Sequence, residues 1–148
     1  MDRRRRTKVL VLSRPELRKE LAGEIAEAHE IVEVERGRQA LVMLKLREGG
    51  RNGLFYAGEL LVSEAKAQVD GAIGLGLVAG EDAEAAWDLA VIDAAFNAAL
   101  PETLRWEAVL LEAESRIASQ EADEAGRVAA TAVNFDSMQT ERPLWALI

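Results

Sequence analysis

The 148-residue chain contains no cysteine and only one histidine, His29. Without cysteine there is no disulfide, no thiolate nucleophile and no cysteine-bound metal. Aromatic residues make up 5% of the chain, and no apolar run reaches the roughly 18 residues that a membrane-spanning helix needs. These absences fit a cytoplasmic protein without a membrane segment.

The composition is that of a folded, soluble domain. Hydrophobic residues make up 49% of the chain and charged residues 30%, which is typical of globular rather than disordered proteins. The length suits one ordinary domain with its own core.

Charge is distributed unevenly along the chain. Residues 1–8 hold five basic and one acidic side chain, a net of +4, which leaves 13 basic and 25 acidic residues, a net of −12, for the rest. Such an acidic body is a poor surface for nucleic acid, so no nucleic-acid partner is expected. We expect the basic segment 1–12 to be a solvated, frayed terminus, or else to touch phosphate or an acidic partner.

Hydrophobic periodicity predicts an α+β domain with an N-terminal helix, a four-stranded, mostly antiparallel meander, two C-terminal helices and a tail. The expected helices cover residues 14–28, 83–99 and 102–130. Two early strands would meet at a turn at Gly37 and Arg38, and a strand over 72–78 would follow a hairpin turn at Asp70 and Gly71. Residues 13–138 then form one domain, between the basic segment 1–12 and a tail over 139–148.

The stretch GAIGLGLVAGED, residues 71–82, has the glycine content of a phosphate-binding loop. Its glycines at 74, 76 and 80 are spaced one residue too long for the dinucleotide fingerprint, and Glu81 and Asp82 would repel a phosphate at the following helix. The better interpretation is structural. Gly74 and Gly76 would leave room for a helix or a partner chain, Gly80 would make a turn, and Asp82 would cap a helix.

No catalytic, cofactor-binding or metal-binding residues are predicted. His29 lacks the spacing of a metal motif, and no serine lies in a nucleophile-elbow context. A small-molecule pocket would most plausibly involve Glu59, Asp82 and Asp93. Asp93 lies among apolar residues, so we expect it to be partly buried and to bond a neighbouring chain.

The remaining candidates point to protein–protein contact. Trp87 could lie in an interface or in the core, and the small-residue seam of the last helix would let another surface approach closely. The candidate partner-interface residues are Phe55, Tyr56, Glu59, Trp87, Asp93, Ala118, Ala122, Ala125, Phe135 and Met138.

An ordered series of short motifs resembles PhnG, a subunit of the carbon–phosphorus lyase system. The series comprises Phe55, Gly58 and Glu59 in one strand, the Asp70-Gly71 turn, Val78, Gly80 and Asp82, and Asp93-Ala94 in a helix. The stretch VNFDSM, residues 133–138, is similar to the family's ending. The resemblance covers most of residues 13–138.

This resemblance implies an accessory or structural subunit of a complex that breaks down organophosphonates. The complex transfers a phosphonate onto the ribose of ATP and releases adenine, an alpha-D-ribose 1-methylphosphonate 5-triphosphate synthase type of reaction. Its other subunits, PhnI-, PhnH-, PhnJ- and PhnL-like, would be the partners. ATP would be used by the complex, and this chain would hold no cofactor of its own.

Two alternatives remain open at this point. The chain could be a homodimeric scaffold, or a small-molecule or nucleotide-binding domain with no link to phosphonates. A homo-oligomer of the isolated chain is compatible with the first alternative and with the lyase subunit.

Overall fold

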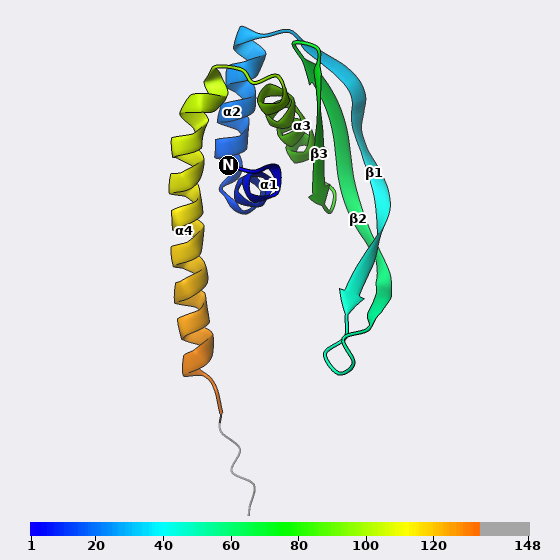
Figure 1. Ribbon diagram of the computed structural model, residues 1–148, viewed down its shortest axis with the longest axis vertical. Helices are drawn as coiled ribbons and strands as arrows, with labels where there is room; N and C mark the ends of the chain where they lie inside the picture. Colours follow the sequence, from blue (N-terminus) through cyan, green and yellow to red (C-terminus); the bar gives the residue numbers. More distant parts are fainter. Residues whose placement is uncertain (134–148) are drawn as a thin grey trace, which may run out of the picture. The chain divides into compact units, whose positions relative to one another are not determined.

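The computed structural model describes residues 1–133, and the chain divides into two compact units, residues 1–117 and 118–148. Four helices and three strands occur within the described residues (Figure 1). In chain order they are α1 (Arg3–Leu12), α2 (Pro15–Ala28), β1 (Ile31–Arg47), β2 (Leu54–Val69), β3 (Ala72–Ala79), α3 (Ala83–Asn97) and α4 (Glu102–Ala130).

The three strands form one antiparallel sheet in the order β1-β2-β3. β2 and β3 are joined at Asp70 and Gly71, both of which have positive φ angles, +47° and +82°. Two positive φ angles in a two-residue loop define the tight hairpin turn for which Asp-Gly is suited, so the predicted turn is confirmed. β3 pairs with β2 only over residues 62–69, whereas β1 pairs with β2 along almost its whole length.

α3 packs against the sheet at unusually close range. A Cβ atom placed on Gly74 would lie 2.1 Å from the carbonyl oxygen of Ala90, and one on Gly76 would lie 1.8 Å from that of Ala86. Only glycine leaves room for the helix backbone at these two positions. The interpretation of Gly74 and Gly76 as space for a helix is therefore confirmed.

The turn from β3 into α3 is held by two polar side chains. Ser63 Oγ donates to the carbonyl oxygen of Gly80 at 2.8 Å and accepts from the backbone N–H of Asp82 at 3.0 Å. The Asp82 carboxylate then accepts from the N–H of Ala85 at 2.9 Å. Asp82 thus caps α3, as its sequence position predicted.

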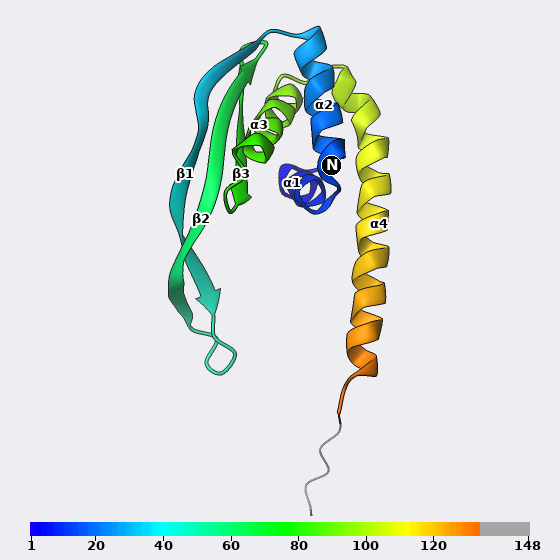
Figure 2. The ribbon, with the colours of Figure 1, turned by 180° about the vertical axis from the view of Figure 1, so that it is seen from behind.

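The core of residues 1–117 lies among α1, α2, α3 and the first turns of α4, on one side of the sheet (Figure 2). Trp106 of α4 is buried, contacts Phe96 of α3 edge-on, and donates its indole N–H to Glu24 of α2 at 2.8 Å. The largest fully buried hydrophobic side chains are Leu10, Ile25, Val69, Val91, Ile92, Trp106 and Leu110.

The predicted four-stranded meander is wrong, because the two early strands are one 17-residue strand, β1. No turn forms at Gly37 and Arg38. Instead the pairing with β2 shifts between Glu35 and Arg38, which marks a bulge. A Cβ on Gly37 would come within 3.0 Å of Ala83, so this glycine allows β1 to pass close to the start of α3.

The predicted single N-terminal helix is also wrong, because the basic segment forms a further helix, α1. Its Val9 and Leu10 side chains are buried in the core, and Arg6 is buried with them. The segment expected to be frayed is therefore part of the packed structure.

Residues 118–130 continue helix α4 into the second unit, and every one of them is exposed. No helix within residues 1–133 is both long and apolar enough to cross a membrane.

Replacing Gly76 by alanine should destabilise the fold severely, because the new methyl group would overlap the α3 backbone. We expect a loss of at least about 3 kcal/mol in the free energy of unfolding, the upper end of overpacking effects. Urea unfolding followed by circular dichroism measures it.

The matched control is Gly23→Ala in α2, where an added Cβ meets no atom within 4 Å. Alanine in a helix interior should stabilise by up to about 1 kcal/mol. Equal stability of the two variants would contradict the close packing of α3 on β3.

Candidate functional site

Beyond the end of β3, β1 and β2 continue as a two-stranded β-ribbon, residues 41–47 and 54–61. In an antiparallel pair, directly opposite residues point to the same face. The ribbon therefore has two distinct faces, and the pairing of the two strands identifies their members.

One face of the ribbon carries only apolar side chains and Gly58. Opposite pairs on it are Val42 with Leu60, Leu44 with Gly58, and Leu46 with Phe55. Leu44, Leu46, Phe55 and Leu60 are each between 38% and 46% exposed. We call this set, Val42, Leu44, Leu46, Phe55 and Leu60, the apolar face.

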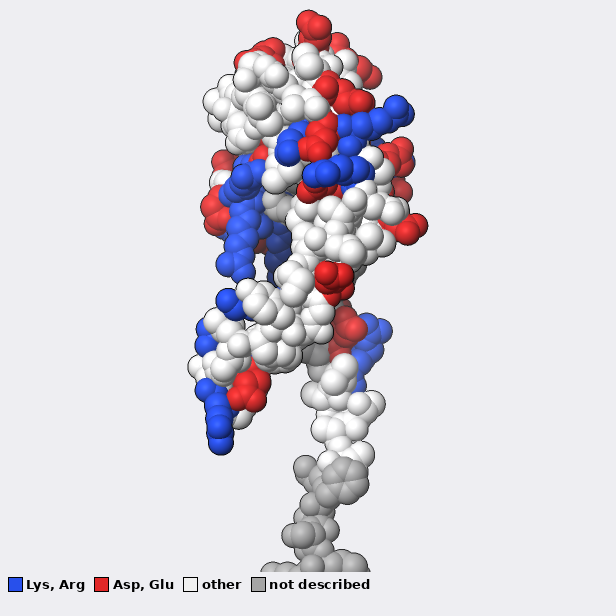
Figure 3. All heavy atoms as spheres, turned by 90° about the vertical axis from the view of Figure 1, so that its right-hand side faces the viewer, with Lys and Arg blue, Asp and Glu red and all other residues white. Residues whose placement is uncertain are grey.

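The other face, the mixed face, combines apolar and charged side chains: Leu41, Met43, Lys45, Arg47, Leu54, Tyr56, Glu59 and Leu61. Tyr56 is 62% exposed, and the Lys45 ammonium lies 5.5 Å from its ring centre. In Figure 3 basic side chains gather along one edge of a largely uncharged surface on this part of the molecule, and acidic side chains also lie there.

Of the predicted interface residues, Phe55, Tyr56 and Glu59 all lie on the ribbon, Phe55 on the apolar face and the other two on the mixed face. Their exposed neighbours Leu41, Met43, Leu44, Leu46, Leu54 and Leu60 were missed. The sequence signal for these residues was the alternation of apolar side chains in both strands. The same alternation is typical of strands whose apolar face is buried, so it does not identify an exposed surface.

Gly58 is the site of a bulge in β2. Its φ angle is +150°. Leu44 of β1 pairs with Gly58 and the next residue, Lys45, pairs with Tyr56, so Ala57 is the extra residue on β2. Glycine suits such a bulge, because it has no side chain to clash at this backbone conformation.

Asp93 is buried in the core of residues 1–117, and its carboxylate is bonded within its own chain. It accepts from Arg3 at 2.7 Å, from Arg6 at 2.9 Å and from the backbone N–H of Leu75 at 3.0 Å. Asp93 therefore ties α1 and β3 to α3.

Arg6 is the buried partner of this ion pair. Burial lowers the pKa of its guanidinium, and the nearby Asp93 carboxylate opposes that shift. The guanidinium also stacks over the Phe96 ring, 3.9 Å from its centre. The arginine-rich start is thus used in folding: Arg3 and Arg6 bind Asp93, and Arg5 pairs with Glu114 of α4.

Glu59, Asp82 and Asp93 do not form a shared pocket. Asp82 caps α3, and Asp93 lies eleven residues further along the same helix, roughly 16 Å away at the helical rise. Glu59 lies on the ribbon opposite Met43, beyond the part of β2 that pairs with β3.

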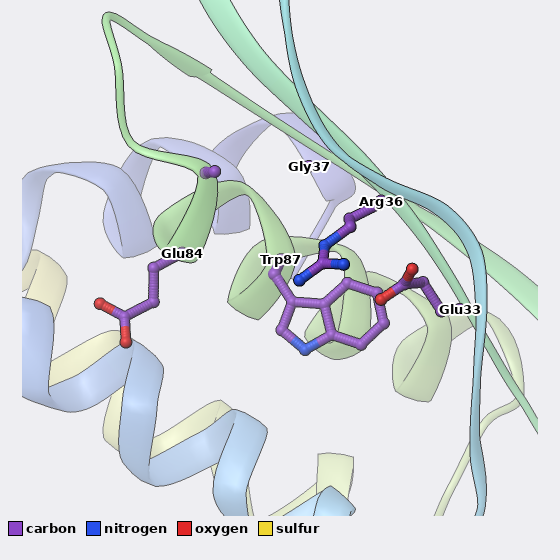
Figure 4. Close-up of a pocket in the computed structure, with 6 residues that line it drawn as sticks. Glu33, Arg36, Gly37, Glu84 and Trp87 are labelled. Atoms are coloured by element: carbon purple, nitrogen blue, oxygen red, sulfur yellow. The ribbon is translucent and has the colours of Figure 1, made fainter.

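Trp87 is half-buried at the edge of a cleft of about 290 Å³ between β1 and α3. The Arg36 side chain reaches toward the indole, and Glu33 lies beside it (Figure 4). The other lining residues are Gly37, Ala83 and Glu84. Nearby on α3, burial and the charge of Glu84 raise the pKa of Asp88.

His29 ends α2, where its N–H donates to the carbonyl oxygen of Ile25 at 2.8 Å. Its ring nitrogens lie 3.2 Å from Asp70 and 3.5 Å from Glu102. A backbone hydrogen bond lowers the pKa of the Glu102 carboxyl group, and a hydrogen bond with His29 lowers it further. Within residues 1–133, no three histidine or acidic side chains are grouped to hold a metal ion.

The remaining interface candidates lie in the second unit. Ala118, Ala122 and Ala125 are exposed on α4. Phe135 and Met138 lie outside the described residues.

Replacing Asp93 by asparagine should cost about 3–5 kcal/mol in the free energy of unfolding, because it leaves the Arg6 guanidinium buried without a counter-charge. Glu114→Gln, which breaks the Arg5 ion pair at the surface, is the matched control and should change stability little. Urea unfolding measures both, and equal effects would contradict the central role of the Asp93 pair.

The family model for PhnG, described as phosphonate metabolism protein PhnG, matches residues 1–140. The matched range contains the arginine-rich helix α1, the β-ribbon and the whole of α3 and α4. No curated protein sequence matches the chain at a significant level. A match over nearly the whole chain shows that it belongs to the PhnG family, whose members take part in phosphonate metabolism.

Proposed function

We propose that this chain is an accessory, structural subunit of a carbon–phosphorus lyase complex and that the β-ribbon binds its partner subunits. Membership of the PhnG family supports the link to phosphonate metabolism. The observation that carries the proposal of a docking subunit is the apolar surface of the ribbon.

The exposed apolar surface of the ribbon is divided between its two faces, four side chains on each. Eight apolar side chains of the ribbon are at least 38% exposed, and together they expose the equivalent of about four whole side chains. At roughly 150–250 Å² for a large side chain, this is about 800 Å². Each partner of a standard interface contributes about 800 Å², so a partner that covers both faces of the ribbon would bury an area of that size.

The roles of the carboxylates support an accessory rather than a catalytic subunit. Asp93 holds two arginines, and Asp82 caps a helix. In this proposal the other subunits, PhnI-, PhnH-, PhnJ- and PhnL-like, carry the chemistry. The complex transfers a phosphonate onto the ribose of ATP with release of adenine, and this chain holds no cofactor.

The second candidate is a homodimeric scaffold, since a second copy could also cover the ribbon. A nucleotide-binding domain has less support, because the space above Gly74 and Gly76 is filled by α3. These alternatives differ in what the purified chain should bind.

Leu46→Asp should weaken binding to the PhnI-like subunit from the same source by at least about 30-fold, because it buries a charge on the apolar face. Isothermal titration calorimetry of the purified proteins measures the dissociation constant. Far-UV circular dichroism checks that the variant is folded.

Val34→Asp is the matched control. Val34 lies on the same strand and is 46% exposed, against 44% for Leu46, but it lies outside the ribbon. We expect this variant to bind nearly as well as the unmodified chain. Equal losses for both variants, or no binding by the unmodified chain, would contradict the proposal.

A further inference from the structure

The sheet has a vacant strand position beside the ribbon. β3 ends at Ala79, opposite Val62 of β2, and the chain then leaves for α3. The N–H of Gly80 makes one last bond, to the carbonyl oxygen of Leu61 at 2.9 Å. Among residues 1–133, no strand lies on this side of β2 over residues 54–60.

The backbone on this side of β2 is oriented to accept a strand. The carbonyl oxygen of Leu61 points there, since it binds Gly80. In an antiparallel strand both backbone groups of a residue point to one edge, and the direction alternates along the strand. The N–H and C=O of Glu59, two residues earlier, therefore point to the vacant position as well.

We propose that an extended segment of a partner subunit occupies this position and adds to β2 as a fourth strand. The inference rests on the proposed function, because it specifies how the ribbon binds its partner. Strand addition satisfies the backbone groups of an exposed edge and sets the added side chains above the two faces of the sheet. It would also continue the line of β3 along the ribbon.

The two faces define the chemistry of the added segment. Its side chains on one side must be apolar to cover Leu46, Phe55 and Leu60. On the other side the nearest side chains are those of Tyr56 and Glu59 of β2, while Lys45 and Arg47 lie on β1, one strand further away. The alternate side chains of the segment should therefore be polar, with a basic one beside Glu59.

A second copy of this chain fits the position less well. Paired through the same edge, it would bring its own Glu59 to the Glu59 of the first copy, and like charges on facing strands are destabilising. The bulge at Gly58 also interrupts the edge, and bulges are among the features by which natural edge strands avoid pairing with their own copies. A partner strand of different sequence can be matched to the interrupted register.

Hydrogen exchange of the complex tests the proposal. The full chain is co-expressed with its PhnI- and PhnH-like partners, and deuterium uptake of peptides over residues 54–61 is compared between the complex and the free chain. We expect exchange in this stretch to slow by at least about tenfold in the complex, as for amides that gain a hydrogen bond.

A pair of variants separates backbone pairing from side-chain contact. Glu59→Pro removes the N–H that faces the vacant position, and proline is tolerated at such an edge. We expect it to weaken partner binding at least about tenfold, because a backbone acceptor of the partner loses its donor. Glu59→Ala removes the same side chain but keeps the N–H, so we expect it to bind at least about tenfold more tightly than Glu59→Pro.

The outcomes separate the two proposals. A complex that forms without slower exchange at residues 54–61 would overturn strand addition and leave the subunit proposal standing. Failure of any complex to form would overturn both. An isolated chain that dimerises with these residues protected would show that a second copy fills the position, which also overturns the inference. If Glu59→Pro does not fold, the hydrogen exchange of residues 54–61 in the complex with the unmodified chain decides whether a strand is added there.

Discussion

The close approach of α3 to β3 is the contact on which the rest of the fold depends. Gly74 and Gly76 let the helix backbone lie directly on the strand, where any larger residue would overlap Ala86 or Ala90. At this range the Asp93 carboxylate of α3 accepts a hydrogen bond from the backbone N–H of Leu75 in β3. The same carboxylate binds Arg3 and Arg6 of α1. One helix–strand contact thus positions the N-terminal helix as well.

The same arrangement leaves the β-ribbon uncovered. β3 has eight residues, against 17 in β1 and 16 in β2, so α3 and its supporting helices pack where the sheet has three strands. Beyond that, both faces of a two-stranded ribbon meet solvent, although one of them is entirely apolar. Isolated two-stranded ribbons are at best marginally stable in water. The ribbon is therefore the part of the described structure that would gain most from a partner, and its exposed apolar side chains are the physical basis for the proposed subunit role.

Features set by local backbone chemistry could be predicted from the sequence. The Asp70-Gly71 turn, the Asp82 cap and the glycines under α3 are examples. Features set by distant contacts could not. Gly37 has the composition of a turn, but its role comes from Ala83, 46 positions later. The arginines of α1 suggested a solvated terminus because their partner, Asp93, is about 90 positions away. Phe55, Tyr56 and Glu59 were found as site candidates, whereas Leu44 and Leu46 were missed because alternation alone does not tell an uncovered strand from a buried one.

We propose, above all, that this PhnG-family chain acts within a complex and not alone. Native mass spectrometry of the affinity-tagged chain, co-expressed with the PhnH-, PhnI- and PhnJ-like proteins of its source, tests that claim most directly. We expect stoichiometric retention of the PhnI-like subunit. Recovery of the tagged chain by itself, as a monomer or a homodimer, would contradict it.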